Sequence, residues 1–164
     1  MNTKLAWAAG LLMVAAISTG CGGSDPESSA SRPAAPQAAE RSKDFGDYVL
    51  HYNALTTNQL PADVAKNFGI PRSKSRAMLN VVMIRKEVGT LGHSVKGTVT
   101  TKTTNLTGQL KNLELRPLTE GDAIYYIGSI QVADGEVLVF NIEATPEGSN
   151  TPMAVKFQQQ FFTR

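Results

Sequence analysis

The stretch "RAMLNVVMIRK" (residues 76–86) decides the fold, because its apolar residues do not alternate with polar ones. Ala77–Leu79 and Val81–Ile84 are separated by a single Asn, so both faces of an extended chain would be apolar. A strand that is apolar on both faces belongs in the middle of a sheet, with other elements covering it from two sides. The stretch therefore predicts the central strand of a β protein.

The segments around this strand show the alternation of strands that are half buried. In residues 45–54, Tyr48, Leu50 and Tyr52 share one face. Further strands are predicted at residues 95–100, 110–118, 123–132, 136–144 and 153–162, with Gly-rich or Asn-rich turns between them. Asp134-Gly135 predicts a two-residue hairpin between two of these strands. About seven antiparallel strands indicate a mainly β fold, a β-sandwich or a small barrel.

One short helix is predicted after the first strand. Pro61 suits the first turn, Asp63 complements the helix N-terminus, and Gly69 ends the segment Ala62–Phe68.

The N-terminus predicts export. Residues 5–17 are apolar but too few to span a bilayer, which takes about 20 residues. The following Ile17–Cys21 resembles the lipobox of bacterial lipoproteins, although Ser18 stands where Leu is usual. We therefore expect residues 1–20 to be a lipoprotein signal peptide and Cys21, the single cysteine of the chain, to carry lipid. Because Gly22 rather than Asp follows, the resemblance implies the periplasmic face of the outer membrane. The alternative is a soluble periplasmic protein.

Composition divides the remaining chain. Residues 21–43 are rich in Pro, Ser and Ala, which predicts a flexible tether, and residues 44–164 have the size of one domain.

The formal net charge is +2, and neither a basic nor an acidic tail is present. A nucleic-acid partner is therefore not expected. The expected partners are the membrane, through acylated Cys21, and a protein of the cell envelope.

Three stretches resemble one protein family: "DFGDYVLHYNAL" (44–55), "LPADVAKNFGI" (60–70) and "RSKSRAMLNVVMIRK" (72–86). They are similar to a domain-of-unknown-function family of exported gammaproteobacterial proteins. The resemblance covers Asp44 to the C-terminus and implies an immunoglobulin-like β-sandwich. It implies no activity.

Residues that could carry catalysis or bind metal are few. His51 and His93 stand outside any hydrolase, metalloprotease or phosphate-binding motif, so no catalytic residue is expected. Copper would suit His and Met ligands, but Met78 and Met83 are an odd number of residues apart and should point to opposite faces of one strand. We expect no metal site and no cofactor.

The basic segment before the central strand is the strongest candidate for a binding site. Arg72, Lys74 and Arg76 alternate, so an extended chain would place their side chains on one face, where they could bind a carboxylate or phosphate. His51 and Tyr52 on the first strand complete the set of candidates. The alternative is a solvated strand entry whose charges protect a sheet edge or pair with Asp44 or Asp47.

Taken together, these features predict a non-catalytic binding module of the cell envelope. One alternative is a carrier of a small apolar ligand or a metal, and an enzyme is less favoured. The final strand, "MAVKFQQQFFTR" (153–164), is a second candidate surface, because its edge could pair with a partner strand.

Overall fold

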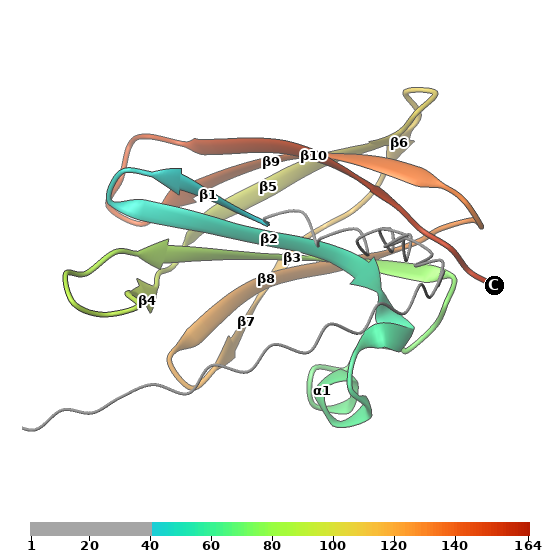
Figure 1. The fold of residues 1–164 in the computed structure, drawn as a ribbon, viewed down its shortest axis with the longest axis horizontal. Helices are drawn as coiled ribbons and strands as arrows, with labels where there is room; N and C mark the ends of the chain where they lie inside the picture. The colour runs from blue at the N-terminus through green and yellow to red at the C-terminus, as the bar shows by residue number, and fades with distance from the viewer. Residues whose placement is uncertain (1–40) are drawn as a thin grey trace, which may run out of the picture. The chain divides into compact units, whose positions relative to one another are not determined.

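The computed structural model describes residues 41–164, which form two antiparallel sheets packed against each other (Figure 1). The first sheet has the order β1-β2-β3-β8-β7 with the short β4 beside β3, and the second has the order β10-β9-β5-β6. The elements are β1 (Ser42–Phe45), β2 (Tyr48–Thr56), a 3-10 turn (Thr57–Gln59), α1 (Ala62–Asn67), β3 (Arg76–Arg85), β4 (His93–Ser94), β5 (Gly97–Asn105), β6 (Leu110–Lys111), β7 (Arg116–Glu120), β8 (Ala123–Gln131), β9 (Val137–Pro146) and β10 (Met153–Gln160). The predicted mainly β sandwich is confirmed.

The predicted signal peptide, Cys21 and the tether up to residue 40 lie outside the described residues. β1 begins at Ser42, just before the predicted start of the domain at Asp44. In the part of the chain that is described, no helix is both long and apolar enough to cross a membrane.

The structure has more strands than the seven expected, because two predicted strands are divided and β4 is an additional strand of two residues. Gly46 adopts a φ of 76° and turns the chain back, so residues 45–54 become the end of β1 and most of β2, with Phe45 opposite Tyr48. Residues 110–118 are split between β6 in one sheet and β7 in the other. The predicted helix forms over Ala62–Asn67, and Gly69 follows it with a φ of 63°.

β3 lies between β2 and β8, as its apolar faces predicted. One face contributes Leu79, Val81 and Met83 to the core between the sheets, where they pack with Phe140 and Ile142 of β9. The other face contributes Met78 to a smaller cluster beneath α1. The segments that flank α1 therefore cover Met78 at one end of the outer face, while Val82 and Ile84 on the same face are partly exposed.

The Asp134-Gly135 turn forms, but the predicted hairpin is wrong. Its flanking strands lie in different sheets, since β8 pairs with β3 and β7 while β9 pairs with β5 and β10. Glu136 N donates to Ala133 O at 3.2 Å, which closes the turn, and Gly135 N donates to Phe161 O at 2.8 Å. Because the chain after β10 pairs with this corner, the turn connects two layers rather than two neighbouring strands.

The carboxylate of Glu136 holds this corner together. One oxygen lies 2.7 Å from Lys111 Nζ of β6, and the other accepts a hydrogen bond from Ala133 N at 2.8 Å. Burial raises the pKa of Glu136, but the hydrogen bonds from Lys111 and Ala133 and the charge of Lys111 lower it by more. The resulting pKa lies below the ordinary value of 4.5. The folded protein therefore holds this proton less tightly than the unfolded chain does.

We expect Glu136→Gln to lower the free energy of unfolding at neutral pH by about 1–2 kcal/mol, through loss of the ion pair with Lys111. The wild-type stabilisation is complete above the ordinary pKa and is lost as the pH falls through the lowered pKa of the folded state. Urea unfolding should thus show the largest difference between the variant and wild type at about pH 7, and a smaller difference at about pH 3, below the ordinary pKa. Glu143→Gln, at an exposed position of β9, is the matched control. An equal loss at both pH values would contradict this role.

Candidate functional site

The sandwich is open along one side, where β5 and β7 lie at the edges of their sheets. β7 ends the first sheet. Within residues 41–164, the two-residue strand β6 is the one strand that pairs with β5 on this side, opposite Thr103 and Thr104. Asn112–Leu115 crosses from β6 to β7. It lies so close to Gly128 that an added Cβ would be 2.3 Å from Glu114 O. The crossing segment closes one end of this side and leaves the other end open.

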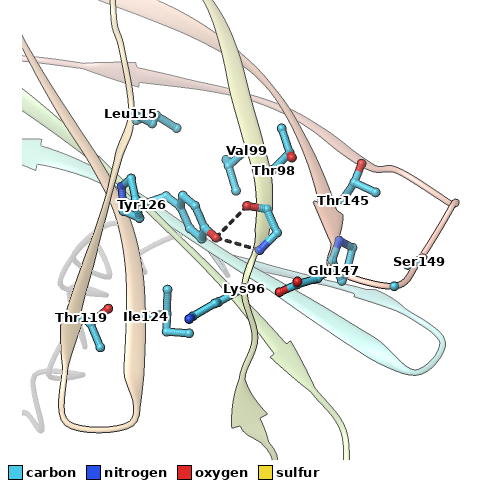
Figure 2. Close-up of a pocket in the computed structure, with 14 residues that line it drawn as sticks. Lys96, Thr98, Val99, Leu115, Thr119, Ile124, Tyr126, Thr145, Glu147 and Ser149 are labelled. Atoms are coloured by element: carbon cyan, nitrogen blue, oxygen red, sulfur yellow. Dashed lines mark hydrogen bonds between the residues drawn. The ribbon is translucent and has the colours of Figure 1, made fainter.

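A cleft of about 940 Å³ occupies the open end (Figure 2). Its inner wall is apolar and is formed by Val99, Leu115, Ile124 and Tyr126. Its mouth carries polar and charged side chains, contributed by Lys96, Thr119, Glu147 and Ser149. This combination of an apolar interior and a few polar groups at the rim is typical of ligand-binding clefts.

Tyr126 connects the two sheets at the base of the cleft. It lies on β8 and is only 5% exposed, and its hydroxyl reaches the backbone of β5. The hydroxyl accepts a hydrogen bond from Gly97 N at 2.8 Å and donates one to Gly97 O at 2.9 Å. A single phenol thus occupies both backbone groups of one residue, as the backbone of a paired strand would. These two bonds link β8 on one wall of the cleft to β5 on the other.

The β7–β8 turn beside the mouth is held by β4. Ser94 Oγ donates to Asp122 O at 2.8 Å and accepts from Ile124 N at 2.9 Å. Ile124, on the cleft wall, is therefore held by Ser94 of β4 as well as by its pairing with Thr119 of β7.

The basic segment does not have the extended conformation on which its prediction was based. Lys74 and Ser75 lie in a turn, because Ser73 Oγ accepts a hydrogen bond from Ser75 N at 3.1 Å. Arg72 Nη2 donates to Asn58 O at 2.8 Å, and Arg76 Nη1 donates to Ser129 Oγ at 3.3 Å on β8. Two of the three cations therefore hold neighbouring parts of the fold. A binding role for Arg72, Lys74 and Arg76 stays a prediction.

His51 and Tyr52 point to opposite sides of β2, so they do not form one site together. His51 is exposed on the outer face, whereas Tyr52 packs against the core, with its ring 4.9 Å from that of Phe157. His93 pairs with Glu87 at 2.8 Å near the end of β3. Among the described residues, Asp44 does not pair with an arginine, which was one predicted alternative. The partner of Asp44 is Lys86, whose Nζ lies 2.6 Å from the carboxylate.

Met78 and Met83 lie on opposite faces of β3, as predicted. Met78 lies beneath α1, and Met83 and Met153 lie in the main core. Among residues 41–164, no three His, Cys, Asp or Glu side chains are grouped as a metal site would require.

The cleft was not predicted from the sequence. Two of its residues carried a local signal, since Gly97 interrupts an alternating strand and Pro117 lies within a predicted strand. These are typical of close backbone approach and of an edge, respectively. Gly97 and Pro117 border the same cleft because Asn112–Leu115 crosses from one sheet to the other, and no local sequence pattern predicts that crossing.

Fold and site together define a β-sandwich protein with a cleft along one open side. The chain belongs to the DUF4426 family, described as a domain of unknown function, whose match spans residues 42–164. The family resemblance inferred from the sequence is thus confirmed.

Solved structures agree with this assignment. A DUF4426 family protein from Pseudomonas aeruginosa is 32% identical, with a TM-score of 0.64 over 76% of this chain and 96% of its own. FetP of uropathogenic Escherichia coli is 14% identical, with a TM-score of 0.53 over 75% of this chain and 93% of its own. A copper-bound variant of FetP is also 14% identical, with a TM-score of 0.55 over 77% and 97%. No curated protein matches the chain closely enough to count as a relative.

Proposed function

We propose that this protein is a non-catalytic binding protein of the bacterial cell envelope, and that the cleft between β5 and β7 holds its ligand. Lipid on Cys21 anchors it at the periplasmic face of the outer membrane. The observation that carries the proposal is the cleft itself, with its buried tyrosine, apolar wall and charged mouth. Its volume of about 940 Å³ falls within the range of ligand-binding pockets. Compartment and anchor are supported by the N-terminal sequence.

The apolar wall also favours a second candidate function, the carriage of a small apolar ligand. Copper carriage is suggested by the copper-bound FetP variant, a protein of similar fold. In this chain, however, Met78 lies in a different cluster from Met83 and Met153. The geometry therefore favours the cleft over a methionine-based metal site.

Photo-crosslinking in living cells tests the cleft. We expect a photo-reactive residue at Thr119, in the mouth of the cleft, to capture a discrete species from the envelope. The matched control is Thr100, which is exposed on the outer face of β5 and does not line the cleft. Mass spectrometry of the captured species separates a protein partner from a small apolar molecule. The same capture pattern at both positions, or none at Thr119, would contradict a binding role for the cleft.

A further inference from the structure

The backbone of β5 is free along part of its outer edge. In an antiparallel pair, successive residues direct their N–H and C=O groups alternately toward the partner and away from it. Lys96 O accepts a hydrogen bond from Glu147 N at 2.8 Å, in register with β9, whereas the N–H and C=O of Gly97 bind Tyr126 instead. Odd-numbered residues of β5 therefore direct their backbone groups away from β9, toward the open side of the sandwich.

Both ends of this edge have partners. Gly97 is bonded by the hydroxyl of Tyr126, Thr103 lies opposite Lys111 of β6, and Asn105 N donates to Gln109 O at 3.1 Å. Between these positions, no strand pairs with Val99 or Thr101 on this side within residues 41–164. Val99 lines the cleft, and Thr101 lines an adjoining hollow of about 390 Å³. The free part of the edge therefore faces open space at both residues.

Two other edge strands, β7 and β10, carry groups that hinder the addition of a strand. On β7, Pro117 lies opposite Tyr126 and has no N–H to offer a new strand. On β10, Lys43 Nζ donates to Ala154 O at 3.3 Å, so a side chain of β1 already binds that edge. Proteins usually protect exposed edges with such prolines and lysines. β5 has neither device at Val99 or Thr101.

We propose that a short extended peptide segment of a partner protein adds to β5 as a further strand, bonded to the backbone of Val99 and Thr101. This inference rests on the proposed function and names the occupant of the cleft. Main-chain donors and acceptors spaced along an edge select an extended backbone, as in other cases of strand addition. Between the Tyr126 bond and β6, the space allows pairing over about three to five residues.

The surroundings define the side chains of this peptide. Those that point inward enter the cleft, against Val99, Leu115 and Ile124, and are therefore apolar. Those that point outward lie beside Lys102, which is exposed and has no ion-pair partner in the described part of the chain. An acidic residue there would form a cross-strand charge pair. The peptide is thus apolar on its inward face and acidic on its outward face.

The test uses the full-length protein in detergent and a displayed library of random ten-residue peptides. We expect selected peptides to alternate apolar residues with at least one Asp or Glu. Bound peptide should slow hydrogen exchange of the Val99 and Thr101 amides by about tenfold or more. Thr101→Pro removes an outward donor and no bond to β9, so it should weaken peptide binding by about tenfold or more. Thr101→Val keeps the N–H and serves as the matched control.

If Thr101→Pro fails to fold, Val99→Pro and the exchange measurement on the wild-type protein still decide the question. The inference is overturned if no peptide is selected, or if a bound peptide leaves both amides exchanging as before. It is also overturned if the protein forms dimers that protect these amides without peptide, because a second copy would then occupy the edge. Capture of a small molecule at Thr119 with no peptide binding would leave the proposed function standing and remove this inference alone.

Discussion

Gly97→Ala is expected to lower the free energy of unfolding by at least about 3 kcal/mol or to prevent folding. A Cβ at this position would lie 2.1 Å from Thr145 O and 2.9 Å from Pro146 Cα, both backbone atoms of the neighbouring strand. It would also lie 2.9 Å from Met83 Cε in the core. A side chain could rotate away, but Thr145 and Pro146 are backbone paired with β5 itself, and they directly follow Ala144, which pairs with Met153 of β10. Displacing β5 would also separate Gly97 from the Tyr126 hydroxyl.

Equilibrium urea unfolding of the full-length protein measures this effect. Thr98→Ala is the matched control, since it also introduces an alanine into β5 but at an exposed position. Gly128→Ala should resemble Gly97→Ala, because its Cβ would lie 2.3 Å from Glu114 O. A Gly97→Ala protein as stable as the Thr98→Ala protein would show that β5 and β9 are not as closely packed as described.

The fold could be predicted from the sequence where the signal was local. "RAMLNVVMIRK" required a central strand because no other position covers both of its faces, and β3 occupies that position. Pro61, Asp63 and Gly69 placed the helix almost to the residue for the same reason. The Asp134-Gly135 turn was also local, but which strands it connects was not. A turn sequence specifies a reversal of the chain, and the pairing of β8 with β3 rather than β9 depends on distant residues.

The site was less predictable, since it arises where two edges meet. The basic segment attracted attention because its charges alternate, yet Ser73 turns the chain and the arginines bind the protein's own backbone and side chains. Tyr126, in contrast, looked like any strand aromatic. Its role depends on Gly97, which lies far from it in the sequence and in the other sheet. Contacts of this kind follow from topology, and no local pattern contains them.

We expect Cys21→Ala to move the protein from the membrane fraction to the soluble fraction and to abolish labelling by a palmitate analogue. The physical reason is the apolar area of the attached chains. Each buried methylene contributes about 0.8 kcal/mol, so two or more acyl chains hold a protein on a bilayer almost irreversibly. Removing the one cysteine removes every site for thioether or thioester attachment. Fractionation and labelling should therefore change together and completely.

Gly22→Asp is the matched variant, because it keeps Cys21 and alters only the residue that follows it. It should label as wild type does and stay membrane-bound, but move from the outer to the inner membrane on a density gradient. The two variants separate lipid attachment from the choice of membrane. Cys21→Ala removes the lipid and with it any membrane location, whereas Gly22→Asp changes only which membrane holds the protein. Unchanged labelling of Cys21→Ala would refute the anchor. A protein that is soluble as wild type would make the periplasm its compartment, with the cleft facing freely diffusing partners.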